Sequence, residues 1–113
     1  MQKPKAVYVT FVMVICMANK KELCIMPPSE LYSTNRYGNL HRHEIFYGVN
    51  RQNSIKYGLV VFLTPEMHNM SNRGVHFDAN FDYTLKKMGQ KAAMKHYGWS
   101  IEDFRAIFGK SYL

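Results

Sequence analysis

The sequence has few cysteines and few acidic residues. Its two cysteines, Cys16 and Cys24, form no CxxC pair, which excludes the disulfide framework of small secreted domains and favours a reducing cytoplasm. Eight Asp and Glu stand against fifteen Lys and Arg, so the formal net charge is +7. This excess favours an acidic partner, either nucleic acid or an acidic protein face, with a merely solubilising surface as the alternative.

A long hydrophobic run is also missing. The most apolar stretch, residues 6–18, is shorter than the roughly 20 residues that span a bilayer, so we expect no membrane partner. No small-residue cleavage site follows it, and its Val, Tyr, Thr and Phe content favours a buried strand. Translation starting at Met13 or Met17 is the alternative, with the first residues an extension.

The remaining sequence has enough apolar residues for one folded unit. With 47% hydrophobic residues the chain is not a disordered one, and 113 residues suffice for a single domain. Its expected parts are an N-terminal strand and loop extension, residues 1–39, and a core, residues 40–113.

Within the core we expect an α+β arrangement. Its elements, in chain order, are a strand over 40–47, a polar loop over 49–56, a strand over 57–63, turn formers over 69–74, a helix from Asp78 to a stop at Gly98, and a short helix over 101–108. Ser100 and Asp103 form a capping box for the short helix, and Gly109 closes it. An antiparallel pair directly before a long helix is a ββα unit, which needs a packed helix or a metal to brace it.

Four histidines are placed around this unit. His41 and His43 lie two apart on the first core strand and share one face. His68 follows the second core strand and His76 precedes the long helix, so folding the hairpin back lets His43, His68 and His76 converge. Three imidazoles plus a water molecule or substrate form an open site for zinc or another divalent ion. The alternative is a set of ordinary surface or hydrogen-bonded histidines.

Several segments share an order and spacing that is typical of one family. They are residues 40–48 (LHRHEIFYG), Asn50-Arg51, Ser54, 56–59 (KYGL), 63–69 (LTPEMHN), 74–76 (GVH) and 108–113 (FGKSYL). Over residues 40–113 the chain resembles the small HNH-type proteins of phages and prophages, which are similar to the phage recombination-enhancement nucleases.

This resemblance implies a ββα-metal finger, to which the sequence adds an N-terminal strand and a short C-terminal helix. It implies His43, His68 and His76 as metal ligands, Asn50 or Asn53 as the residue that braces the loop, and a location in the cytoplasm of a bacterial host. The implied cofactor is a divalent metal, zinc fitting best and Mg²⁺ or Mn²⁺ being alternatives, and the implied activity is cleavage of DNA phosphodiesters.

The chain departs from the family at two places. The residue after the first ligand is usually the histidine base, and here it is Glu44, a weaker base because its unperturbed pKa is about 4.3. His41 is an alternative base, since it shares a face with His43. The family often carries cysteines that clamp the finger through structural zinc, but Cys24 has no CxxC partner and Thr64 occupies a frequent cysteine position.

Basic residues are expected to contact phosphates or an acidic partner. Those near the predicted site are Arg42, Arg51, Lys56 and Arg73, and those every four residues along the long helix are Lys87, Lys91 and Lys95. An ordinary solvated helix face is the alternative reading of the three lysines.

Two functional hypotheses follow. The first is a metal-dependent DNA endonuclease or nickase in which Glu44 or His41 activates water. The second is a phage inhibitor or adaptor whose catalysis has faded, for example an anti-CRISPR protein that binds a host nuclease or another protein that handles nucleic acid and keeps the metal for its fold. A basic domain without metal is a third, plainer interpretation.

Overall fold

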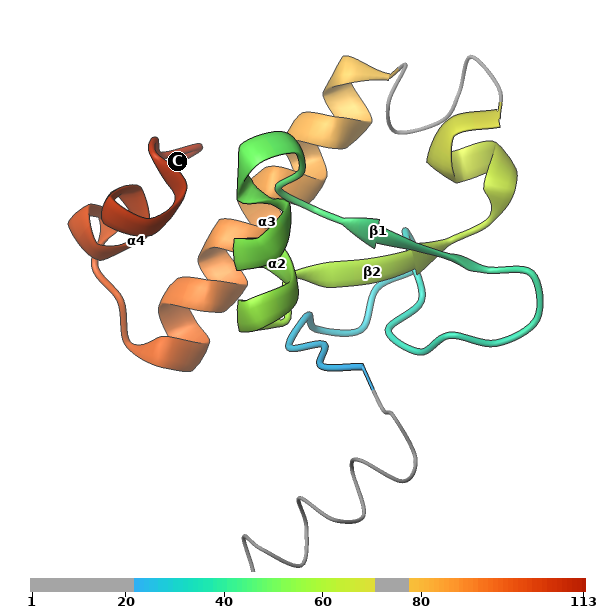
Figure 1. Ribbon diagram of the computed structural model, residues 1–113, viewed down its shortest axis with the longest axis horizontal. Helices are drawn as coiled ribbons and strands as arrows, with labels where there is room; N and C mark the ends of the chain where they lie inside the picture. The colour runs from blue at the N-terminus through green and yellow to red at the C-terminus, as the bar shows by residue number, and fades with distance from the viewer. Residues whose placement is uncertain (1–21, 71–77) are drawn as a thin grey trace, which may run out of the picture.

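A computed structural model gives the fold of residues 22–70 and 78–113, which are the residues the structure describes. In chain order its elements are β1 (His41–Glu44), α2 (Arg51–Tyr57), β2 (Val60–Leu63), α3 (Ala79–Tyr97) and α4 (Ile101–Phe108). The architecture is α+β, with an antiparallel strand pair ahead of the long helix as predicted (Figure 1). The predicted N-terminal strand over 6–18 lies outside the described residues.

Strand β2 has backbone partners on both of its edges. On one side it pairs with β1, in a register that sets His43 opposite Val61. On the other side Phe62 exchanges two backbone hydrogen bonds with Ser33, at 2.9 and 3.0 Å. All four residues of β2 are buried. Strand β1 is shorter than the predicted 40–47, because its last bond toward β2 is the one that Ile45 N–H donates to the Leu59 carbonyl.

The prediction of a polar loop over residues 49–56 is wrong. A 3-10 turn, Gly48–Asn50, leads directly into helix α2. The predicted start of the second strand at residue 57 is wrong for the same reason, because Tyr57 ends α2 and Gly58 caps it in the left-handed conformation, with φ 76°. The sequence Arg51-Gln52-Asn53 has no apolar period, so this helix depends on tertiary contacts rather than on an amphipathic pattern.

One such contact is made by Ser54, a buried residue of α2. Its hydroxyl accepts a hydrogen bond from Phe46 N–H at 2.9 Å and donates one to the Phe46 carbonyl at 2.7 Å. Both backbone groups of Phe46 are thereby satisfied away from water. The end of β1 is fixed to α2 by this pair of bonds.

Replacing Ser54 with alanine is expected to lower the free energy of unfolding by about 1–3 kcal/mol, because two buried backbone groups lose their partner. Denaturant unfolding of both proteins measures the difference. Ser29→Ala removes an exposed loop hydrogen bond and serves as the control, with an expected change within about 0.5 kcal/mol. A Ser54→Ala effect as small as that of the control would contradict the role given to this hydroxyl.

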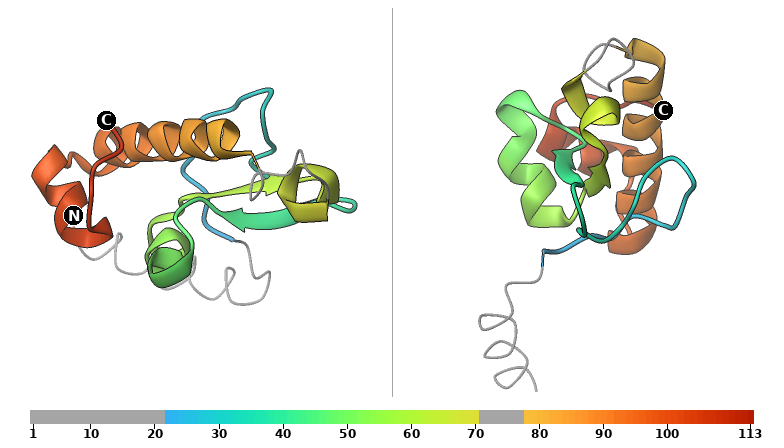
Figure 2. Two further views of the ribbon diagram at one scale, coloured as in Figure 1. Left: turned by 90° about the horizontal axis from the view of Figure 1, so that it is seen from above. Right: turned by 90° about the vertical axis from the view of Figure 1, so that its right-hand side faces the viewer.

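The two C-terminal helices have the predicted limits. Asp78 caps α3 by accepting hydrogen bonds from Asn80 N–H and Phe81 N–H, and Gly98 ends it with φ 70°. Ser100 and Asp103 form the predicted capping box of α4. Helix α3 runs over one face of the strand pair (Figure 2). No helix among the described residues combines the length and apolar character needed to cross a bilayer.

The core lies between the strands, α3 and α4. Phe46 is 2% exposed, and its ring packs against Phe104 and Phe108, with ring centroids 5.4 and 4.8 Å away. Helix α3 approaches closely at Gly89, where an added Cβ would lie 3.1 Å from the Phe46 ring. The buried Gln90 side chain accepts a hydrogen bond from Tyr112 N–H at 2.6 Å, which ties the C-terminal segment to α3.

Candidate metal centre

Three histidine rings lie together near the edge of the sheet where β1 begins and β2 ends. His43 on β1 is 1% exposed, and its ring centroid lies 5.3 Å from that of His68. His41 is exposed, and its ring lies 5.7 Å from that of His68. His68 belongs to a π-helical turn, Glu66–Met70, that follows β2. The predicted neighbourhood of His43 and His68 is present.

The spacing of His43 and His68 can be compared with that of zinc ligands. A Zn–N bond is about 2.0–2.1 Å, so two imidazoles on one tetrahedral ion have their ring centres roughly 5 Å apart. The separation of 5.3 Å agrees with this, and imidazole nitrogen is a suitable donor. Across 22–70 and 78–113 no three His, Cys, Asp or Glu groups are arranged to hold an ion. The third predicted ligand, His76, lies outside the described residues.

Glu44, at the usual base position, forms ion pairs through both carboxylate oxygens. Arg42 Nε lies 2.7 Å from Oε2, and Arg51 Nε lies 3.4 Å from Oε1. The Glu44 side chain is 14% exposed. Successive strand residues point to opposite faces, so Glu44 and Arg42 share one face while His41 and His43 share the other. Of the two predicted bases, His41 is therefore the one on the imidazole face.

Arg42 is also paired with a residue that sequence reasoning did not single out. Its Nη1 lies 2.9 Å from Glu22 Oε1, and Arg36 Nε lies 2.8 Å from Glu22 Oε2. Burial raises the pKa of Glu22, but the hydrogen bonds and charges of Arg36 and Arg42 outweigh it, and the pKa is lowered. Arg42, predicted to bind phosphate, is thus engaged by two carboxylates of its own chain.

The lowered pKa of Glu22 predicts a pH-dependent contribution to stability. A carboxylate whose folded pKa is below its unfolded value stabilises the fold above the ordinary value of 4.5, and this is lost as pH falls through the lowered pKa. At pH 7 the free energy of unfolding of the protein is expected to exceed that of Glu22→Gln by about 0.2–1 kcal/mol. The difference is small because solvent screens the ion pairs of Glu22 with Arg36 and Arg42. Urea titrations from pH 7 to 3 should show the difference vanish, and a constant difference would contradict it.

The predicted bracing asparagines connect two distant parts of the chain. Asn50 Nδ2 donates to the Phe108 carbonyl at 2.8 Å, and Asn53 Nδ2 donates to the Ile107 carbonyl at 3.1 Å. These carbonyls belong to the last turn of α4, where intrahelical partners are lacking. Both residues therefore brace the segment after β1 against the C-terminal helix.

The surroundings of His43 include Tyr47 and a Lys86–Asp82 ion pair, which the sequence analysis missed. The ring of Tyr47 lies 5.8 Å from that of His43, and Lys86 Nζ lies 4.2 Å from the centre of the Tyr47 ring. Lys86 also pairs with Asp82 at 2.9 Å, with side-chain exposures of 14% and 17%. Burial, followed by the Asp82 charge, raises the pKa of Tyr47. The i,i+4 spacing of Asp82 and Lys86 was the available signal.

The positions linked to a structural clamp are used for hydrogen bonds. Cys24 Sγ donates to the Val60 carbonyl at 3.1 Å, and Thr64 Oγ1 accepts from Met67 N–H at 3.2 Å. Burial raises the pKa of the Cys24 thiol, which keeps it protonated at neutral pH and able to donate. Cys24 and Thr64 are therefore both hydrogen-bonded to backbone groups of the fold.

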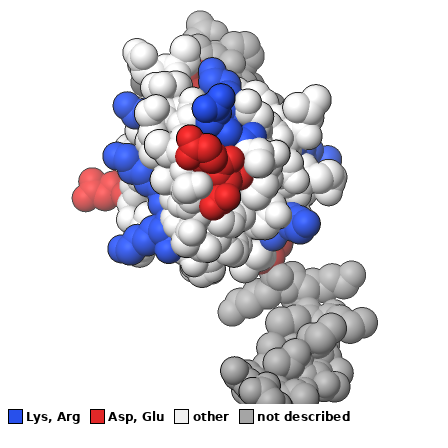
Figure 3. Space-filling model, turned by 90° about the vertical axis from the view of Figure 1, so that its left-hand side faces the viewer, with Lys and Arg blue, Asp and Glu red and all other residues white. Residues whose placement is uncertain are grey.

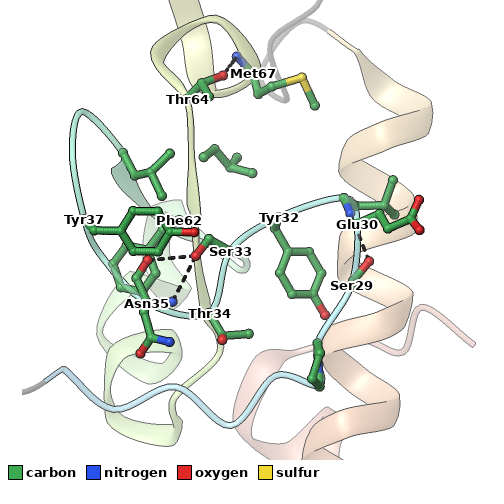
Figure 4. Close-up of a pocket in the computed structure, with 14 residues that line it drawn as sticks. Ser29, Glu30, Tyr32, Ser33, Thr34, Asn35, Tyr37, Phe62, Thr64 and Met67 are labelled. Atoms are coloured by element: carbon green, nitrogen blue, oxygen red, sulfur yellow. Dashed lines mark hydrogen bonds between the residues drawn. The ribbon is translucent and has the colours of Figure 1, made fainter.

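A hollow of about 610 Å³ lies beside the turn that carries His68. It is bounded by the segment from Pro28 to Tyr37 and by β2, with Thr64 and Met67 at one end (Figure 4). Its walls carry hydroxyl and aromatic groups, and its one charged lining residue is Glu30. Without a lysine or arginine it does not extend the predicted phosphate-binding surface.

The predicted basic residues are dispersed over the surface. Arg51, Lys56, Lys87, Lys91 and Lys95 are exposed, and Arg73 lies outside the described residues. On the side that bears α4, separate basic side chains surround a small acidic group instead of merging into one patch (Figure 3).

Comparison of the chain with models of protein families, with curated proteins and with solved structures found no match.

Proposed function

We propose that this protein binds a divalent metal ion through His43, His68 and His76 and cleaves DNA phosphodiesters, as an endonuclease or nickase. The observation that carries the proposal is the placement of the buried His43 ring 5.3 Å from His68, beside the antiparallel pair that precedes α3. Zinc suits the imidazole donors best, and Mg²⁺ and Mn²⁺ are the alternatives. A divalent ion held here would polarise a phosphate oxygen and stabilise developing negative charge.

The residues around the ligands have distinct tasks in this proposal. His41 accepts a proton from the attacking water, because it shares the imidazole face and is exposed to solvent. Glu44 keeps Arg42 and Arg51 in position through its two ion pairs. Arg51, which is 53% exposed at its side chain, retains donors for a phosphate oxygen.

Incubation of supercoiled plasmid with the pure protein and Mg²⁺, Mn²⁺ or Zn²⁺ tests this function. Nicked or linear DNA should appear with at least one metal and disappear with a chelator. His41→Ala should lose activity, and Glu44→Gln should lose less. The absence of nicking with every metal would end the nuclease proposal.

A second function is favoured by the ion pairs of Glu44. Because both carboxylate oxygens are occupied by guanidinium groups, the residue at the usual base position is held in a structural role. This supports an HNH-like phage inhibitor or adaptor in which the metal braces the fold and a host nuclease is the partner. Pull-down with candidate nucleases, together with full biological activity of a His41→Ala/Glu44→Ala double variant, would favour it over the enzyme.

A further inference from the structure

A second surface hollow lies on α3, formed by residues that the metal centre does not use. It has a volume of about 600 Å³ and runs between the C-terminal half of α3 and the segment that contains Ile25 and Pro27. Its floor is apolar, with Met88 and Ala92 from α3 facing that segment. We call it the α3 groove. Methionine in such a position adapts its shape to different bound side chains.

The rim of the α3 groove is basic. Lys91 and Lys95, one helical turn apart, line it together with His96, and no acidic residue does. Both lysines are exposed, and within the described ranges neither forms an ion pair. An apolar floor edged by unneutralised cations is complementary to an apolar segment that carries carboxylates.

The groove divides the row of lysines on α3 into two parts. Lys87 continues the four-residue spacing of Lys91 and Lys95 but does not line the groove, and its Nζ lies 5.3 Å from the Tyr83 ring centre. A phosphate-binding ridge would use all three lysines. A docking groove would use only Lys91 and Lys95, so the three residues distinguish the two kinds of surface.

We propose that the α3 groove docks an acidic, amphipathic protein segment, with apolar side chains over Met88 and Ala92 and carboxylates against Lys91 and Lys95. Such segments commonly bind by laying an apolar face into a groove with a polar rim. The small size of the site predicts a transient complex rather than an obligate one. This inference is independent of the proposed cleavage of DNA, since no groove residue belongs to the metal centre.

Binding of a fluorescein-labelled helical peptide to the full chain tests the proposal by fluorescence anisotropy. The probe places Leu at i, i+4 and i+7 on one face and Glu on the other, and a matched peptide has Lys for Glu. The acidic peptide should bind, and Lys91→Glu/Lys95→Glu should weaken it at least tenfold, corresponding to about 1.4 kcal/mol. Lys87→Glu, the same substitution at one site of the same helix, should weaken it less than twofold.

Backbone amide shifts of the full chain, recorded with the acidic peptide, locate the binding. Shifts centred on Met88, Lys91 and Ala92 support the proposal. Failure of the acidic peptide to bind, or equal binding of the two peptides, would overturn it. Equal weakening by Lys87→Glu would show that the peptide responds to the charge of the whole lysine row and not to the groove. A sedimenting mass for Lys91→Glu/Lys95→Glu that differs from that of the unmodified chain would indicate that a second copy occupies the groove, and either result also overturns the proposal.

Discussion

His43→Ala is expected to lower metal-dependent nicking of plasmid DNA by at least about 100-fold. Loss even of a residue that only supports a metal ligand costs about 10–100-fold in affinity or activity, and His43 is predicted to be a ligand itself. His43 is 1% exposed and its ring centroid lies 5.3 Å from that of His68, so neither a water molecule nor another side chain can readily take its place. Initial nicking rates at saturating metal measure the effect.

Because His43 is buried, its truncation also removes packing, and a second variant is needed. His68→Ala, in the half-buried turn after β2, should lose nicking to a similar extent with a smaller loss of stability. Thr84→Ala, exposed on α3, is the control and should nick at the unmodified rate. Full activity in both histidine variants would contradict the assigned ligands, and parallel loss of activity and melting temperature would favour a structural metal.

Phe46→Ala is expected to lower the free energy of unfolding by about 3–5 kcal/mol, a large part of the 5–15 kcal/mol typical of a domain. The Phe46 ring contacts Phe104, Phe108 and Tyr112, at centroid separations of 5.4, 4.8 and 5.4 Å. Its removal opens a cavity between the end of β1 and both C-terminal helices. Urea unfolding followed by Trp99 fluorescence measures the change.

Two further variants keep this test interpretable. Phe46→Leu retains most of the apolar volume and should lose markedly less stability, which leaves a folded protein to measure. Tyr37→Ala truncates an aromatic ring that is 65% exposed and should change the stability within about 0.5 kcal/mol. A Phe46→Ala loss below about 1 kcal/mol would mean that the core is not centred on this ring.

The parts of the fold that the sequence predicted are those with local signals. Asp78 and Gly98 bound α3, and the Ser100–Asp103 box begins α4, because caps act through neighbouring backbone groups. Helix α2 was missed because the residues that hold it, Asn53 and Ser54, bind the Ile107 carbonyl and the backbone of Phe46. Such contacts have no signature in a short window of sequence.

The candidate site was predictable to a similar degree. Alternation along a strand placed His41 and His43 on one face, and the antiparallel pairing of β1 with β2 brought His68 to them. The ion pairs of Glu44 were not foreseen, because Arg51 comes from the helix that had been predicted as a loop. The Cys24 and Thr64 contacts were also missed, since each has a backbone partner that is set by the fold.

The central claim is that the histidines bind a metal ion, and elemental analysis of the purified full chain tests it most directly. After equilibration with a small excess of Zn²⁺ and gel filtration, about one zinc ion per chain is expected. The His43→Ala and His68→Ala variants should retain far less, and Thr84→Ala should retain the full amount. Zinc that is absent from the unmodified protein, or retained equally by both histidine variants, would contradict the account.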